Sequence, residues 1–244
     1  MNRKISCAAL LIAGLTIGQP VAAAPLIMNG GFELGFTGWT VVNAPGSAGS
    51  FFLQTGTASP VNGLSVPPPP GGSTAAMTDA EGPGAHVLFQ DFLVPATVST
   101  ATLMFDWFVN NLDTTFRTPN TLAFDTPTLN QQARVDILRV TADPFTMNAS
   151  DVLFNVFRTN PGDPLTSGYN TLSTDIASLL ASNAGTTLRL RFAETDNVNI
   201  FNFGVDNVNL EVNAQEVPIP EPATLLLVGS GVGTACAARR RKKA

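Results

Sequence analysis

Apolar side chains recur at every second position in the middle of this chain, and this spacing restricts the fold more than any other feature of the sequence. Within residues 103–110, Leu103, Phe105, Trp107 and Val109 alternate with Met104, Asp106, Phe108 and Asn110. In the same way, Leu188, Leu190 and Phe192 alternate with Arg189 and Arg191. A period of two places alternate side chains on opposite faces of a β-strand, so both segments are predicted to be half-buried antiparallel strands.

Further strands are expected where short runs of β-forming residues lie between turn-rich stretches. These runs are residues 50–54, 86–94, 132–140, 151–158 and 203–212. Helical spacing is confined to residues 175–182, where Ile176, Leu179 and Leu180 share one side of a short helix. Two segments rich in Pro, Thr and Asn, residues 58–73 and 110–128, are expected to be surface loops. The sequence therefore predicts an all-β fold made of two antiparallel sheets.

The region between residues 24 and 216 contains no cysteine and no lysine, and its 17 acidic residues outnumber six arginines for a net charge of −11. Nucleic acid is excluded as a partner, because phosphate recognition needs a basic face. Internal disulfides are also excluded. The fold must therefore be stabilised by burial, for which about 190 residues in one domain suffice.

The first residues have the pattern of a secretory signal peptide. Arg3 and Lys4 precede an apolar run at residues 5–17, and small residues follow at positions 21–24. We expect a signal helix over residues 1–23, export by the Sec machinery and cleavage after Ala23. The folded domain is then expected to span residues 24–216.

The last residues are predicted to form a short membrane helix. Residues 223–238 carry no charge, and as a helix they would reach about 24 Å, short of a hydrocarbon core of about 30 Å. Five cations follow and are expected to hold the far end on the cytoplasmic side: Arg239, Arg240, Arg241, Lys242 and Lys243. The segment is long enough for transient membrane insertion and short for a permanent anchor.

Pro220, Glu221 and Pro222 stand directly before this apolar run. A Pro-Glu-Pro core, a short apolar helix and a terminal Arg-rich cluster resemble the PEP-CTERM sorting signal of Gram-negative bacteria that make exopolysaccharide. The resemblance covers residues 217–244. It implies recognition and cleavage by an exosortase, a membrane protease, and the alternative is an ordinary C-terminal membrane anchor behind a Pro-rich linker.

A second resemblance spans the domain. Asn29-Gly30-Gly31-Phe32-Glu33 near its start and Phe203-Gly204-Val205-Asp206-Asn207-Val208 near its end are similar to the two edges of a galactose-binding-like jelly roll, as in carbohydrate-binding modules. That resemblance implies a jelly-roll sandwich and a structural Ca²⁺ shared by Glu33 and Asp206. Asp206 is two and four residues from Val208 and Leu210, so in a regular strand it lies on the same face and is expected to point into the core. The alternative is a carboxylate satisfied by backbone N–H groups or an arginine without an ion.

Catalytic signals are weak. His86 is the only histidine and is interpreted as an ordinary strand-edge side chain, which argues against a catalytic triad and excludes a His-rich zinc site. Two carboxylate pairs, Asp91 with Asp106 and Asp136 with Asp151, are open as glycosidase candidates. Aromatic residues including Trp39, Trp107 and Tyr169 are expected mostly in the core, with a sugar-stacking platform as the alternative.

These observations favour an exported, non-enzymatic protein of the cell surface or exopolysaccharide matrix, with a structural or adhesive role. A carbohydrate-binding module is the alternative, and a polysaccharide hydrolase or lyase is the third possibility. Exosortase, the Sec machinery and exopolysaccharide are the expected partners.

Overall fold

A computed structural model describes residues 24–213. This part of the chain folds into strands and one short helix: β1 (Ala24–Pro25), β2 (Thr40–Asn43), β3 (Ser50–Gln54), β4 (Ala75–Asp79), β5 (Gly84–Leu93), β6 (Thr100–Asn111), β7 (Gln131–Arg139), β8 (Val152–Arg158), β9 (Asn170–Asp175), α1 (Ala177–Ser182), β10 (Thr187–Asp196) and β11 (Phe201–Asn213). The predicted signal helix and C-terminal membrane helix lie outside the described residues. Within residues 24–213, none of the helical structure has the length and apolar character needed to cross a bilayer.

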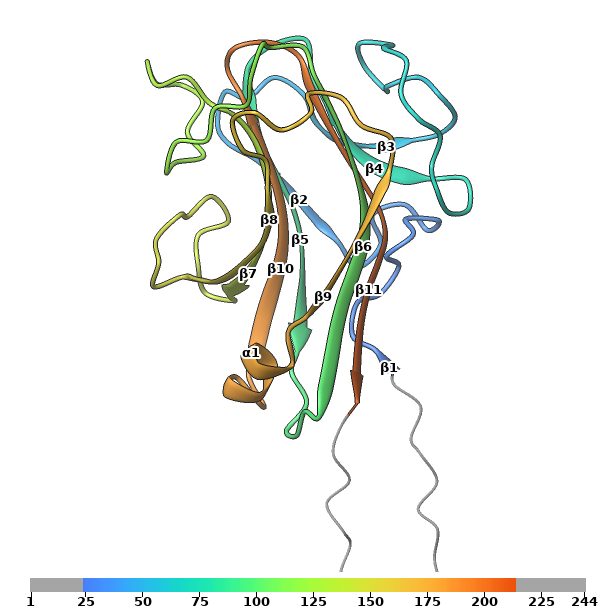
Figure 1. The fold of residues 1–244 in the computed structure, drawn as a ribbon, viewed down its shortest axis with the longest axis vertical. Helices are drawn as coiled ribbons and strands as arrows, with labels where there is room; N and C mark the ends of the chain where they lie inside the picture. The colour runs from blue at the N-terminus through green and yellow to red at the C-terminus, as the bar shows by residue number, and fades with distance from the viewer. Residues whose placement is uncertain (1–23, 214–244) are drawn as a thin grey trace, which may run out of the picture.

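The strands form two antiparallel sheets that pack face to face (Figure 1). Sheet A has the order β3-β4-β11-β6-β9, and β1 pairs with the last part of β11. Sheet B has the order β2-β5-β10-β7-β8. The predicted two-sheet antiparallel sandwich is therefore confirmed, with β11 and β10 as the central strands.

The core lies between the sheets and is filled by the inward residues of the alternating strands. Leu103, Phe105 and Val109 of β6 face Leu190 and Phe192 of β10 in one buried cluster. The ring centroids of Phe105 and Phe192 are 5.3 Å apart in an edge-to-face contact. The alternation along the sequence thus marks the surface that each sheet removes from water.

The predicted strand bounds differ from the structure by a few residues at most. The strand at residues 50–54 has the predicted bounds, whereas β10 runs four residues further than the predicted end at Phe192. Four strands were not predicted: β1, β2, β4 and β9. Of the two predicted loops, residues 58–73 contain no strand beyond an isolated bridge, and the first two residues of 110–128 belong to β6.

Two predictions about side-chain orientation are wrong. The register of β11 against β6 shifts between Asp206 and Asn209, at a β-bulge where Asn207 has φ 50°. The bulge reverses the parity, so Phe203 and Val205 point into the core before it and Val208 after it, while Asp206 lies on the outer face of sheet A. The second error concerns His86, which is buried on the interior strand β5 and is 1% exposed.

Candidate functional site

Glu33 lies in the turn between β1 and β2, directly after the buried Phe32, whose φ is 55°. Its carboxylate accepts hydrogen bonds from the backbone N–H groups of Ser73 and Thr74, both at 2.8 Å, and from the Ser73 hydroxyl at 2.8 Å. These donors, first of all the Ser73 N–H, hold the pKa of Glu33 below its ordinary value. The carboxylate therefore ties the first turn of the domain to the end of the Pro-rich loop.

Asp206 is fully buried although it lies on the outer face of sheet A. Its Oδ1 accepts from the backbone N–H of Asn207 at 2.7 Å, and its Oδ2 accepts from the N–H of Gly71 at 3.1 Å. Burial raises the pKa of Asp206 to about 6 against the effect of these bonds. Glu33 and Asp206 thus bind the same short loop, two residues apart. The donors on both carboxylates are N–H and O–H groups, and binding of Ca²⁺ between them stays a prediction.

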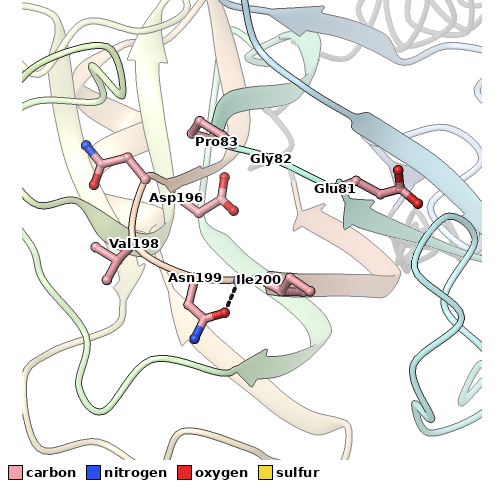
Figure 2. Close-up of a pocket in the computed structure, with 8 residues that line it drawn as sticks. Glu81, Gly82, Pro83, Asp196, Val198, Asn199 and Ile200 are labelled. Atoms are coloured by element: carbon pink, nitrogen blue, oxygen red, sulfur yellow. Dashed lines mark hydrogen bonds between the residues drawn. The ribbon is translucent and has the colours of Figure 1, made fainter.

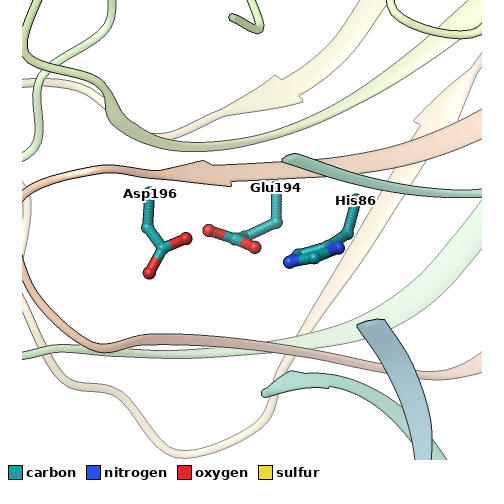
Figure 3. Close-up of side chains that lie close together, drawn as sticks. All are labelled: His86, Glu194 and Asp196. Atoms are coloured by element: carbon teal, nitrogen blue, oxygen red, sulfur yellow. The ribbon is translucent and has the colours of Figure 1, made fainter. Parts of the chain in front are cut away.

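A buried polar cluster faces the space between the sheets from the adjacent strands β5 and β10. It consists of His86, Glu194 and Asp196, whose imidazole and carboxylate ligand atoms all lie within 4.8 Å of one another (Figure 3). Glu194 is directly opposite His86 in the β5–β10 register. The three residues are 1%, 1% and 5% exposed, in the order His86, Glu194 and Asp196. A group of ionisable side chains this deep in a sandwich requires a compensating partner.

Burial shifts the pKa of each member of the cluster toward its neutral form. The pKa of His86 is lowered to about 4 by desolvation, which the backbone carbonyl of Ala48 near the ring partly opposes, and the pKa of Asp196 is raised to about 7, mainly by desolvation. Desolvation and then the neighbouring charge of Asp196 raise the pKa of Glu194 well above its ordinary value. The Nδ1 of His86 lies 2.9 Å from Oδ1 of Asn43, whereas His86 Nε2 and Glu194 Oε1 are buried without a hydrogen-bond partner.

Asp196 also lines a surface pocket of about 240 Å³ beside the cluster (Figure 2). The pocket is bounded by two short connections, residues 81–83 before β5 and residues 197–200 between β10 and β11. The backbone N–H of Gly84 donates to Asp196 Oδ1 at 3.0 Å and fixes that carboxylate at the pocket wall. The cluster is therefore buried, but one of its members borders a space open to solvent.

The first of the two carboxylate pairs considered for glycoside hydrolysis is not brought together. Asp91 is on the outer face of sheet B, where it accepts from Arg189 Nε at 2.7 Å. Asp106 is on the outer face of sheet A and accepts from Thr171 and Asn207. The members of this first pair lie on opposite outer faces of the sandwich, so they share no cleft.

Asp136, from the second pair, is buried in an ion network on the outer face of sheet B. Its carboxylate accepts from Arg134 at 2.6 and 2.7 Å, from Arg191 at 2.5 Å and from Asn155 at 2.8 Å. Burial pushes the pKa of Asp136 upward, but hydrogen bonds and charges of the two arginines outweigh it and hold the pKa below its ordinary value. Asp151 instead accepts from the Thr146 hydroxyl in a turn. Asp136 is therefore the counter-ion of Arg134 and Arg191.

An aromatic pocket opens at one edge of the sandwich, between the edge strands β8 and β9. Trp107 of β6 and Phe157 of β8 line it with ring centroids 4.5 Å apart, and both rings are half-buried. The polar side chains of Asp163, Thr166, Ser167 and Asn170 complete the wall. Trp107 was predicted to be a core residue, and it packs against the core while also bordering this pocket. An apolar plate beside several hydrogen-bonding groups is suited to a sugar ring.

Sequence reasoning did not find the cluster of His86, Glu194 and Asp196. The signal that it overlooked is the parity of β10, since Glu194 and Asp196 continue the inward series Leu188, Leu190 and Phe192. Two carboxylates at core positions of one strand indicate a buried polar site by their spacing alone. The pairing with His86 required the β5–β10 register.

The fold and these sites define a two-sheet antiparallel β-sandwich with a buried polar cluster and an aromatic edge pocket. Residues 218–242 match the PEP-CTERM protein-sorting motif, which confirms the sorting signal recognised at Pro220-Glu221-Pro222. The motif implies export, cell-surface sorting and processing by an exosortase. No curated protein matches the sequence.

Solved structures with similar folds include carbohydrate-binding modules. TmCBM61 in complex with β-1,4-galactotriose has a TM-score of 0.43 and 12% identity over 77% of this chain and 97% of that chain. The K1 cleaved adhesin domain of Lys-gingipain from Porphyromonas gingivalis W83 has a TM-score of 0.41 and 12% identity over 74% and 92%. The enzymatically active domain of bacteriophage CBA120 tailspike protein 4 has a TM-score of 0.44 and 13% identity over 77% and 21%. At these identities the likeness concerns the strand arrangement alone.

Proposed function

We propose that this protein is a structural or adhesive component of the cell surface or exopolysaccharide matrix, without catalytic activity. The observation that carries the proposal is the PEP-CTERM sorting motif at residues 218–242. The signal-peptide pattern at residues 1–23 supports Sec-dependent export. After export, the apolar residues 223–238 hold the chain in the inner membrane transiently, until exosortase removes them.

The test is the C-terminus of the surface-associated protein. In a strain with a working exosortase, mass spectrometry of that protein should find no peptide from residues 225–244, and replacement of Glu221 by Ala should restore those peptides. An intact C-terminus on the mature surface protein would contradict the sorting proposal. Deletion of the protein should alter biofilm formation or flocculation, and an unchanged matrix would contradict the structural role.

The aromatic pocket supports a second candidate function, the binding of matrix glycan. Trp107 and Phe157 offer apolar ring surface, while Asp163 and Asn170 are exposed and able to bond sugar hydroxyls. Such contacts fix a sugar without activating a glycosidic bond. Within residues 24–213, the carboxylate pairs considered for hydrolysis lie apart or are tied to arginine, as described above.

This function is tested by glycan affinity. The wild type should bind the exopolysaccharide of its host saturably and release no new reducing ends, and Trp107→Ala should weaken binding at least tenfold. Phe154→Ala is a matched control, because Phe154 is on β8 outside this pocket and is 40% exposed. If a folded Trp107→Ala variant retains full affinity, the pocket is not the binding site. Release of reducing ends would identify an enzyme instead.

A further inference from the structure

In strand β10, the inward-facing positions are apolar in the first part of the strand and acidic in the last part. Leu188, Leu190 and Phe192 belong to the inter-sheet cluster, and Glu194 and Asp196 have the same parity. His86 lies opposite Glu194 on the neighbouring strand β5. Figure 3 shows the three side chains pointing to the same side of these strands, with the Glu194 carboxylate between Asp196 and His86. The backbone thus places three potential ligands at one point of the inter-sheet space.

The cluster has unused lone pairs in a buried position. In the tautomer that carries the proton on Nδ1, His86 donates to Oδ1 of Asn43 and the lone pair of Nε2 is available to a ligand. That Nε2 has no hydrogen-bond partner, and neither has Oε1 of Glu194. A second-sphere bond from Nδ1 to a carbonyl-type oxygen is the usual way in which a metal-binding histidine is oriented.

The cluster also lacks a positive partner from the protein. Between residues 24 and 213 there is no lysine, and the described ion pairs of arginine are made with Asp113, Asp136 and Asp91. Two acidic side chains buried side by side without a cation are costly, since each must lose its hydration to ionise. A bound cation would remove this cost and use the free lone pairs at the same time.

We propose that His86 Nε2 and the carboxylates of Glu194 and Asp196 bind a divalent transition-metal ion of the Zn²⁺ class. The ligand atoms all lie within 4.8 Å of one another, and His86 Nε2 and Glu194 Oε1 have no hydrogen-bond partner, so one ion can reach all three side chains after small rotations. One imidazole nitrogen with two carboxylate oxygens suits Zn²⁺ or its neighbours, whereas Ca²⁺ prefers oxygen ligands alone. This site is separate from Glu33, in the turn between β1 and β2, and from Asp206, on the outer face of sheet A.

The pocket beside Asp196 gives an ion access to this position. An added Cβ on Gly84 would lie 2.5 Å from His86 Nε2 and 2.8 Å from the carbonyl oxygen of Ala48, so only a residue without a side chain lets the imidazole lie here. Asp196 borders the pocket formed with residues 81–83 and 197–200, which connects the cluster to solvent (Figure 2). Three protein ligands next to a solvent-filled space leave a coordination position for water.

The proposal is tested with the full chain, without a histidine tag and with Cys7→Ser and Cys236→Ser replacements, so that thiols and tags bind no metal. After treatment with chelator, isothermal titration should show one equivalent of Zn²⁺ per chain and at least tenfold weaker binding of Ca²⁺. In a thermal melt, Zn²⁺ should raise the melting temperature. Glu194→Gln and His86→Gln should each weaken Zn²⁺ binding at least tenfold. Glu211→Gln, the same replacement on the exposed Glu211 of β11, should leave it unchanged.

Stability without metal distinguishes a ligand from a structural carboxylate. Glu194→Gln removes a buried acid with an unpartnered oxygen, so the metal-free variant should melt no lower than the metal-free wild type while losing the Zn²⁺-induced increase. His86→Gln provides the same comparison should the first variant fail to fold. Absence of stoichiometric Zn²⁺ binding by the folded wild type, unchanged binding by a folded ligand variant, or equal affinity for Ca²⁺ would overturn the proposal.

Discussion

The ion network of Asp136 should contribute strongly to the stability of sheet B. Asp136 and Arg191 both have fully buried side chains, and the Arg134 side chain is 8% exposed. Asp136→Asn keeps the volume of the side chain but leaves two arginines without their anion. Breaking a buried pair by removing one partner costs about 3–5 kcal/mol. For a domain of this size the loss corresponds to a decrease in melting temperature of roughly 6–20 °C.

Asp91→Asn is the matched control on the same sheet. It breaks the pair with Arg189, but the Asp91 side chain is 35% exposed, and Arg189 keeps its contact with the Phe89 ring at 3.8 Å. The expected cost is smaller, about 1 kcal/mol, because solvent reaches the exposed Asp91 carboxylate and weakens the ion pair, although Arg189 itself is buried. Both variants should be compared by urea denaturation, since guanidinium is itself a salt and screens charges.

Two further results are expected for the Asp136 network. Adding Arg191→Met to Asp136→Asn should recover part of the lost stability, because the second replacement removes a buried cation without a partner. The pKa of Asp136 is held below 3.8 in the folded state, so the advantage of the wild type should be present above about pH 4 and lost as the pH falls through the lower, folded-state pKa. A cost below about 1 kcal/mol for Asp136→Asn, no larger than that of Asp91→Asn, would refute the assigned role of burial.

Three other outcomes are expected. Residues 24–216 expressed alone should give a far-UV circular dichroism spectrum dominated by β-structure and a stability unaffected by reductant, and a helical spectrum would contradict the fold. If Ca²⁺ is bound by the Asp206 site, chelator should lower the melting temperature by several degrees and Asp206→Ala should abolish that effect; an unchanged wild-type curve with a destabilised Asp206→Ala would show that the carboxylate acts only as a hydrogen-bond acceptor. Gly30→Ala should destabilise the domain severely, because its Cβ would lie 1.8 Å from the carbonyl oxygen of Val208, whereas Gly168→Ala, with no atom within 4 Å of its Cβ, should have little effect; similar melting temperatures for the two would contradict the close approach at Gly30.

The sequence identified the strands whose two faces differ in polarity and missed those whose faces do not. Strand β4 has the sequence AAMTD and is buried at all five positions, so it shows no alternation. Strand β9, NTLSTD, is a polar edge strand that is half-buried at Leu172 and Thr174 only. Both are recognisable from their neighbours in sheet A, which no single-strand pattern contains.

The candidate sites show the same division between local and long-range information. The parity of Asp206 was misread because the bulge at Asn207 shifts the register, and nothing before it in β11 signals the extra residue. The contacts of Asp206 with Gly71 and of Glu33 with Ser73 join segments that are 135 and 40 residues apart. Sequence could suggest that both acids need partners, but only the fold identifies the loop that supplies them.

The pairing of β1 with the end of β11 determines how the domain is presented to its surroundings. Ala24 lies opposite Val212, so the chain enters and leaves the sandwich at one pole, the pole at which α1 also lies (Figure 1). The loops around Asp196 and residues 159–168 are at the opposite pole, because β10 runs away from α1 and β8 ends there. If the domain is held through its C-terminal segment, the pocket beside Asp196 and the aromatic pocket therefore lie toward the pole away from the attachment, where neighbouring polymers and cells can reach them.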